Sequence, residues 1–324
     1  AMDMAAANLI EPGDRAVVVN IGYFGDRYAA ILERYGAVVD QVYAPTVGDA
    51  PSLDDVEAAL ADHQPKLMTI THVDTSTAVK ADVQALAALG REYGALVVVD
   101  GVCAVAGEEL RQEAWGVDLA LTASQKAIGV PPGLALLVAG PRAMDAFYRR
   151  TTPAGNYYAD WALWLPIMES YEARRPSYFG TPPVNLIAAL NVSLGQILDE
   201  GMDARFARHR HLSDAFKAAI SALGMDQVPV RPEVAANTLT APYYPDGVDG
   251  TLPGLVGQEG AIVAGGLHPE IKARYFRVGH MGAVNASDIV ATVAAVERSL
   301  ARADYDFEPG AGAAAAQAVL CTAV

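Results

Sequence analysis

Asp100 and Lys126 each follow a short apolar run, and together they could bind and activate a carbonyl compound. Asp100 ends a run of aliphatic residues at 95–99, and Lys126 comes shortly after the run at 117–122. Short β-branched runs flanked by helical segments are typical of buried parallel strands. Ligands bind at the carboxyl ends of such strands. We therefore expect the carboxylate and the amine to meet at one edge of a sheet.

Lys126 lies between an apolar strand and a tight turn at 129–133 that contains two prolines. A surface lysine after a strand is the ordinary alternative. At this position, however, the chain is held rigidly between strand and turn. A desolvated lysine in such a place can act as a Schiff-base nucleophile.

Asp100 stands where a carboxylate is costly unless it meets a cation, although an aspartate that caps a turn is the common alternative. A protonated pyridine nitrogen is one such cation. Pyridoxal phosphate (PLP) needs this arrangement, because a lysine binds its aldehyde and an aspartate holds its ring nitrogen, which makes the ring an electron sink. The pair Asp100 and Lys126 is therefore consistent with a PLP site.

Other polar and aromatic residues follow the expected strands. Thr75, Ser76 and Thr77 form a hydroxyl cluster, of which one is explained by a helix cap and the others are free for a phenolic oxygen or a phosphate. Phe24 lies in a glycine-flanked loop, where it either packs in the core or stacks on a planar ring.

Arg277 lies between apolar neighbours in a strand-like segment, where an arginine is costly without a partner. A bidentate clamp on a substrate carboxylate is a specific explanation. Tyr178 and Thr181 are either plain loop residues or hydroxyl donors to a phosphate. The histidines show no metal-ligand spacing, so we expect no metal.

The pattern of elements predicts an α/β fold with a parallel-rich sheet. Strands alternate with helices up to residue 139, with connections of a few residues. After about residue 141 the chain becomes helical, and a smaller α+β part follows. We expect a large domain at 1–200, a small C-terminal domain at 201–303 and a flexible tail at 304–324, which is rich in Ala and Gly. Expected strands lie at 15–20, 37–43, 66–72, 95–99, 117–122 and 134–139, and expected helices at 27–35, 52–62, 82–93, 203–223 and 286–302.

Composition excludes several classes of function. The net charge of −15 argues against nucleic acid as a partner, because phosphate backbones bind basic surfaces. No apolar run approaches the roughly 20 residues that span a bilayer, so we expect no membrane partner. Cys103 and Cys321 give no disulfide framework, which favours an intracellular location. The sequence does not distinguish cytoplasm, mitochondrion and peroxisome.

Several segments together resemble one family. They come in the order of the class V, fold-type I PLP-dependent aminotransferases, and the resemblance is greatest to alanine–glyoxylate aminotransferases. It covers about residues 1–302. The segments are THVDTST at 71–77, VDGV at 99–102, WGVD at 115–118, SQKA at 124–127, PPGL at 131–134, SYFGTPP at 177–183 and YFRVGHMG at 275–282.

The resemblance implies a large domain with a mostly parallel seven-stranded sheet and a role for each candidate residue. Lys126 would form the Schiff base with PLP and then move a proton between the substrate Cα and the cofactor. Asp100 would hold the pyridinium, and Arg277 would bind the α-carboxylate of the amino acid and the oxo acid. The remaining expected cofactor contacts are Val102 and Phe24 on opposite faces of the ring, Thr75 at the ring oxygen, Gln125 at the phosphate, and Tyr178 and Thr181 at the phosphate of the other subunit.

The activity implied is transfer of an amino group from alanine to glyoxylate, which yields pyruvate and glycine and would contribute to glycine biosynthesis. The active unit would be a homodimer. Serine as donor, or pyruvate as acceptor, remains an alternative. So does a cofactor-free interaction protein, since the family's phosphate-binding loop would precede residue 1. We expect an N-terminal segment with that loop to be missing from the sequence. A desulfurase would need a cysteine on a mobile loop, and neither Cys103 nor Cys321 is so placed.

Overall fold

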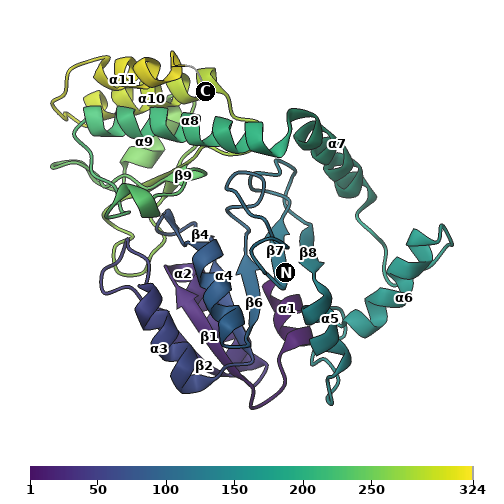
Figure 1. Ribbon diagram of the computed structural model, residues 1–324. Helices are drawn as coiled ribbons and strands as arrows, with labels where there is room; N and C mark the ends of the chain where they lie inside the picture. The colour runs from purple at the N-terminus through teal and green to yellow at the C-terminus, as the bar shows by residue number, and fades with distance from the viewer. Residues whose placement is uncertain (323–324) are drawn as a thin grey trace.

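A computed structural model describes residues 1–322, and its centre is a six-stranded sheet (Figure 1). The strand order is β2-β1-β3-β6-β7-β8, in which all neighbours are parallel except β7 and β8. The mostly parallel sheet is as expected. The seventh strand implied by the resemblance is not found in residues 1–322, where only the six strands visible as apolar runs pair in this sheet. These are β1 (Arg15–Asn20), β2 (Val38–Tyr43), β3 (Leu67–Thr71), β6 (Leu96–Asp100), β7 (Leu119–Ala123) and β8 (Ala135–Ala139).

Helices cover both faces of the sheet, because successive strand residues point to opposite sides. Ala16 and Val18 of β1 pack with α1 (Met2–Leu9) and α2 (Tyr23–Arg34), whereas Val17 and Val19 pack with α3 (Leu53–His63) and α4 (Val83–Glu92). Ser52 caps the start of α3, since Asp55 N donates to Ser52 Oγ at 3.1 Å. The alternating burial fixes the register of the sheet and thus which residues reach its carboxyl edge.

A short hairpin, β4 (Val73–Asp74) with β5 (Val79–Lys80), follows β3 directly. It pairs with itself rather than with the central sheet. It therefore carries residues 73–80 past the carboxyl edge of the sheet, next to the end of β6.

Three helices connect the two parts of the chain. In Figure 1, α6 and α7 lie away from the central sheet at the side of the molecule. This segment consists of α5 (Pro141–Tyr148), α6 (Trp161–Glu172) and α7 (Val184–Glu200). Gly201, with φ +81°, separates α7 from the next helix. The domain boundary that we expect near residue 200 falls at this junction and stays a prediction.

The C-terminal part is α+β and has its own apolar core. The long helix α8 packs against a three-stranded antiparallel sheet and two further helices, with Phe216, Ile220, Phe276 and Val293 in the core. Its elements are α8 (Met202–Ala222), η1 (Pro232–Val234), β9 (Leu239–Thr240), α9 (Leu252–Gln258), β10 (Ala264–Gly265), β11 (Phe276–Gly279) and α10 (Ala286–Arg302).

The expectation of a flexible tail at 304–324 is wrong for the part of that segment that forms a helix. Residues Ala311–Leu320 form helix α11, which packs against α8. Glu297 accepts hydrogen bonds from the backbone amides of Gly310 and Ala313, at 3.1 and 3.0 Å, which fixes the start of the helix. Alanine has the highest helix propensity, and small side chains allow close approach to Leu223. The last two residues of the expected tail, 323 and 324, lie outside the described residues.

None of the helices within residues 1–322 is both long and apolar enough to cross a bilayer.

Candidate active site

The carboxyl ends of three neighbouring strands bring the candidate residues to one edge of the central sheet. Strands β3, β6 and β7 are adjacent in the sheet, and Asp100 pairs with Thr71 on one side and Leu121 on the other. Asp100 is the last residue of β6, and Lys126 follows the end of β7 by three residues. The site is therefore built on the most buried strands of the fold.

Asp100 is a buried carboxylate whose hydrogen bonding from the described residues comes from a single backbone amide. It is 3 % exposed, and its Oδ1 accepts from Val102 N at 3.0 Å. Burial, together with the nearby charge of Asp74, raises the pKa of the Asp100 carboxyl to about 7, while the Val102 amide and the Lys126 amine act in the opposite direction. A bound cation would therefore stabilise its ionised form.

Two other buried acids have the cationic partners that Asp100 lacks among the described residues. Glu108 has Lys80 at 3.7 Å, and Asp118 has Arg142 at 3.1 Å. The ion pairs among the described residues give Asp100 no such partner. This carboxylate thus fits a cationic ligand rather than a structural ion pair.

Lys126 is half-buried in a turn that side-chain and backbone hydrogen bonds hold in place. Ser124 Oγ donates to the carbonyl of Pro131 at 2.7 Å and accepts from Leu134 N at 3.3 Å, and Val130 N donates to the carbonyl of Ser124 at 2.9 Å. The charge of the amine acts on the pKa of both Asp100 and the buried Cys103 thiol. The amine is therefore within electrostatic range of the end of β6.

Asp74, in the hairpin after β3, positions two other candidate residues. It is fully buried and accepts from Phe24 N at 2.8 Å and from both Ser76 N and Ser76 Oγ, at 2.8 and 2.6 Å. It thereby caps α2, on whose first turn Phe24 lies half-buried. Sequence reasoning did not single out Asp74, since its main partner lies 50 residues away.

The three hydroxyls at 75–77 have different surroundings. Ser76 Oγ is used by Asp74 and Tyr23 N, and Thr77 Oγ1 donates to the carbonyl of Ile21 at 2.8 Å. Both therefore have structural roles. The Thr75 hydroxyl, in contrast, lies beside the Cys103 thiol, whose pKa it lowers against the larger, raising effect of burial. Of the cluster, Thr75 is the hydroxyl best placed for a ligand.

Arg277 of β11 connects the C-terminal part to this edge of the sheet. Its Nη1 donates to the carbonyl of Thr75 at 3.1 Å and its Nε donates to the carbonyl of Gly265 at 2.8 Å. The salt bridges among the described residues do not include Arg277. Because a guanidinium carries five N–H donors, several remain for a ligand carboxylate.

Val102 and Gln125 flank the two central residues. Val102 is half-buried, packs on the cluster that includes Leu121, and donates its amide to Asp100. Gln125 is exposed next to Lys126. Both lie where a ligand between Asp100 and Lys126 could contact them.

Tyr178 and Thr181 do not join this group within one chain. They lie in the connection between α6 and α7, where Tyr178 is 70 % exposed and its hydroxyl lies 3.3 Å from Thr181 Oγ1. In Figure 1 this connection lies beyond the edge of the sheet.

The cavities described for the chain lie elsewhere. One of about 1590 Å³ is lined mainly by the C-terminal part, including Arg210, Lys217 and Tyr243. Another of about 560 Å³ has His72 and Trp115 in its wall. Within residues 1–322, no group of three or more His, Cys, Asp or Glu residues could hold a metal ion. Asp100, Lys126, Thr75 and Arg277 line neither of these two cavities.

Comparison with known proteins identifies a family for this chain. The family model described as "Aminotransferase class-V" matches residues 1–317. Alanine–glyoxylate aminotransferase 1 of Saccharomyces cerevisiae is 39 % identical over 289 residues, which cover 86 % of this chain and 74 % of that protein. L-aspartate–glyoxylate aminotransferase of Paracoccus denitrificans is 32 % identical, covering 97 % of this chain and 79 % of that protein.

A solved structure agrees with these relatives. The crystal structure of alanine–glyoxylate aminotransferase from Nostoc sp. matches with a TM-score of 0.87 and 33 % identity, covering 92 % of this chain and 78 % of that chain. Since the family model spans nearly all of the sequence and the relatives exceed 30 % identity over most of their length, the chain belongs to the class V aminotransferase family.

Proposed function

We propose that this aminotransferase moves the amino group of alanine to glyoxylate, giving pyruvate and glycine. The observation that carries the proposal is the position of Arg277, a guanidinium with free donors that contacts Thr75 at the edge where Asp100 and Lys126 lie. Substrates with a single carboxylate need one such clamp. The 39 % identity to the yeast alanine–glyoxylate enzyme supports the choice of donor and acceptor.

Pyridoxal phosphate is the cofactor of this family, and the residues of this chain fit it. Asp100 is buried without a cationic partner, which suits a protonated ring nitrogen. Thr75 would donate to the ring oxygen, and Val102 and Phe24 would cover the two ring faces. PLP supplies an electron sink for the bonds at the substrate Cα.

The phosphate of the cofactor would be held from several sides. Tyr178 and Thr181 of a second copy would donate their hydroxyls to it. Gln125 would donate from the turn that bears Lys126.

Three residues would do the chemistry. Asp100, held by the Val102 amide, keeps the ring nitrogen protonated. Lys126 Nζ would take the proton from the substrate Cα and deliver it to the cofactor, and would carry out the reverse transfer when the oxo acid is converted. Arg277 binds the α-carboxylate and orients the Cα–H bond toward Lys126.

The surroundings of Phe24 favour a small substrate. The guanidinium of Arg27 stands 5.0 Å from the ring centroid of Phe24 and also 5.0 Å from that of Tyr23. If Arg27 covers one face of Phe24, the other face is left for the cofactor, and Arg27 is kept from the substrate. A dicarboxylate donor such as aspartate would then lack a second cation. Serine, which is close to alanine in size, is the alternative donor.

We propose in addition that the active unit is a homodimer in which Tyr178 and Thr181 reach the partner's cofactor phosphate. The connecting helix α7 supports this, because it exposes apolar side chains in one chain. Exposed apolar patches of this kind mark interfaces. The exposed residues of α7 are Val184, Ile187, Val192, Leu194 and Leu198.

A donor panel tests the activity. We would assay purified protein, loaded with PLP, with alanine, serine or aspartate and with glyoxylate as acceptor, and measure glycine and each oxo acid. We expect kcat/KM for alanine to exceed that for aspartate by at least about tenfold, because one clamp leaves a second carboxylate unpaired. Aspartate as the best donor would refute the proposed specificity.

A Lys126→Ala variant tests the reaction itself. We expect it to lose the visible absorbance of the protein–cofactor complex and at least about 10⁴-fold in kcat. Lys66→Ala is the control, since Lys66 pairs with Asp14 and Glu11 at the opposite end of the sheet. Full activity of the Lys126→Ala variant would overturn the mechanism.

A further inference from the structure

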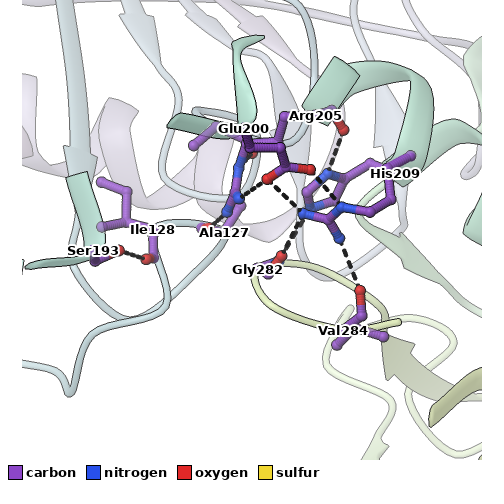
Figure 2. Close-up of polar contacts among 10 residues, drawn as sticks. Ala127, Ile128, Ser193, Glu200, Arg205, His209, Gly282 and Val284 are labelled. Carbon is purple, nitrogen blue, oxygen red and sulfur yellow. Dashed lines mark hydrogen bonds and ion pairs between the residues drawn. The ribbon is translucent and has the colours of Figure 1, made fainter. Parts of the chain in front are cut away.

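Four residues at the junction of α7 and α8 form a connected polar cluster, which we call the α7–α8 clamp. Its members are Glu200, Arg205, Arg208 and His209 (Figure 2). Both arginines bind the carboxylate of Glu200, Arg205 through Nη1 at 2.7 Å and Arg208 through Nε at 2.6 Å. The remaining donors of the clamp point to backbone atoms of three separate loops.

Arg205 binds the two loops that carry the expected cofactor contacts. Its Nη2 donates to the carbonyl of Ala127 at 2.6 Å, and its Nε donates to the carbonyl of Ala106 at 2.7 Å. Ala127 is the residue directly after Lys126. Ala106, which has a positive φ of 69°, belongs to the loop that follows Asp100 and contains Val102. Arg205 itself is 5 % exposed, so these contacts are shielded from water.

Arg208 and His209 bind the loop that follows β11, the strand of Arg277. Arg208 donates to the carbonyls of Gly282 and Val284 at 3.0 and 2.8 Å. His209 Nδ1 donates to the carbonyl of Arg205 at 2.8 Å, which leaves Nε2 to accept from Gly282 N at 3.0 Å. Figure 2 shows Arg205 and His209 pointing to opposite sides of Glu200, toward the Ala127 turn and the Gly282 loop.

Further contacts hold the same turn from α7 and from the C-terminal loop. Ser193 Oγ donates to the carbonyl of Ile128. Gly282 has a φ of +85°, and a Cβ on it would come within 3.6 Å of the Ala127 carbonyl oxygen and 3.7 Å of the Lys126 carbonyl oxygen. The backbone from Lys126 to Ile128 is therefore confined by α7, α8 and the loop after β11.

Stability alone does not explain such a cluster. Arg205 is buried whereas Glu200 is 26 % exposed, and the desolvation of the buried guanidinium offsets much of the attraction between the two charges. An arginine fork, however, fixes two carbonyl groups relative to each other, which a lysine or an apolar side chain cannot do. In the clamp, the two fixed carbonyls belong to the loop of the amine and to the loop of the ring-binding carboxylate.

We propose that Arg205 is a positioning residue for catalysis, because it fixes the position of Lys126 relative to the ring held by Asp100. Glu200, Arg208 and His209 connect this arrangement to the loop next to Arg277. The proposal rests on the role of Lys126 put forward above. A shift of about 1 Å in a group that transfers a proton costs on the order of 10²-fold in rate. Loss of Arg205 should consequently lower kcat while leaving the position of the Arg277 guanidinium unchanged.

The test compares Arg205→Met with Arg142→Met. Arg142 is the control, because it also pairs with an acid and donates to two backbone carbonyls, those of Gly94 and Ala95, at the opposite end of β6. We would measure kcat and KM for glyoxylate, and the pH midpoint of the visible absorbance of the cofactor-loaded protein. We expect Arg205→Met to lower kcat about 10- to 100-fold, to change KM less than about threefold and to shift the pH midpoint.

The control separates positioning from stability. Arg142→Met should lower the midpoint of urea unfolding while leaving kcat and the pH midpoint of absorbance unchanged. If Arg205→Met lowers kcat no more than Arg142→Met, or leaves the pH midpoint at the wild-type value, the proposal is overturned. Failure of Lys126 itself would be seen separately, as retained activity in Lys126→Ala.

Arg205→Lys keeps the test valid if Arg205→Met does not fold. Lysine retains the charge next to Glu200 but cannot donate to the Ala106 and Ala127 carbonyls with a fixed fork. We expect a folded protein that binds PLP, with kcat still reduced at least about fivefold and a shifted pH midpoint. Wild-type kcat and pH midpoint in Arg205→Lys would also overturn the proposal.

Discussion

The carbonyl oxygen of Thr75 accepts a hydrogen bond from Arg277 Nη1 at 3.1 Å, although 202 residues separate the two along the chain. The hydroxyl of the same threonine lies beside Cys103, next to the end of β6. Thr75 thus lies between the Arg277 guanidinium, which is expected to bind the substrate carboxylate, and the place expected for the cofactor ring. The backbone of residues 73–80 would therefore set the distance between the cofactor ring and the Arg277 guanidinium.

Replacing Arg277 by lysine should weaken substrate binding more than it slows the chemistry. A lysine gives one point contact where the guanidinium can give a paired one, and it loses the contact to Thr75. We expect KM for alanine and glyoxylate to rise about 10- to 100-fold and kcat to fall less. Steady-state kinetics measure both. Arg274→Lys serves as the control, since Arg274 is exposed and stacks on Tyr243, and an unchanged KM in Arg277→Lys would contradict the assignment.

Asp100→Asn should stabilise the cofactor-free protein at alkaline pH while removing activity. The pKa of Asp100 is raised by burial from 3.8 to about 7. The folded state therefore binds more protons than the unfolded state between these values, and the stability from this group is lost as pH rises through that window. Asparagine never ionises, so above pH 7 the variant should be more stable by up to about 4 kcal/mol.

Urea unfolding of the cofactor-free wild type and Asp100→Asn at pH 5 and pH 8 measures this difference. In the same variant we expect kcat to fall at least about 100-fold, because the ring nitrogen loses its carboxylate. Equal free energies of unfolding of the two proteins at pH 8 would contradict the raised pKa of Asp100.

Acid should destabilise the protein through three buried histidines. Burial is the largest cause that lowers the pKa of His72 and His280 to about 3 and of His209 to about 4. Since their ordinary value is 6.5, the unfolded state binds more protons below that pH. Stability is present above pH 6.5 and is lost as pH falls toward 4.

The effect is best measured in the Asp100→Asn background, because Asp100 has the opposite sign over part of the same window. We expect the free energy of unfolding to fall by about 2 kcal/mol per histidine at most between pH 7 and pH 5. His209→Gln should reduce the slope by about one proton, since glutamine does not titrate. A flat profile in this range would refute the prediction.

Two inactive variants should restore activity when they share a dimer. One chain carries Lys126→Ala, and the other carries Tyr178→Ala with Thr181→Ala. If Tyr178 and Thr181 serve the partner's site, a mixed dimer has one site with all defects and one intact site. Random assembly then gives about a quarter of the wild-type number of intact sites.

Co-expression with two different tags, followed by tandem purification, isolates the mixed dimer. Activity per dimer should be near half that of the wild type. A protein that stays monomeric, or a mixed dimer as inactive as its parents, would exclude the shared site. Lys126→Ala paired with Asp100→Asn is the control, because those residues lie in the same chain's site and each would impair a different site.

Much of the fold follows from local patterns. The six apolar runs each become a strand, since alternating residues such as Val17 and Val18 are both apolar and thus require cover on both faces. The cap of α3 could be read from Ser52 and Asp55. The order of Asp100, Lys126 and Thr75 at one edge follows from the parallel arrangement of β3, β6 and β7.

Features that depend on distant partners could not be read in this way. The Ala-rich segment at 311–320 is ordered because α8 lies beside it, whereas its composition alone predicts a flexible segment. Asp74 looks like one polar residue among several until Phe24 N is placed next to it. Arg205 looks like the polar face of an amphipathic helix, whereas its partners at Ala106 and Ala127 are 99 and 78 residues away.

Asp100 also bears on how long the protein lasts in a cell. Because the buried Asp100 carboxylate has no ion-pair partner among the described residues, the cofactor-free chain is the less stable form, and the ring nitrogen of bound PLP would supply the missing cation. A ligand at 100 times its Kd adds about 2.7 kcal/mol to stability by mass action. When cofactor supply is short, proteases would therefore remove this chain faster, and its abundance would follow the cofactor level.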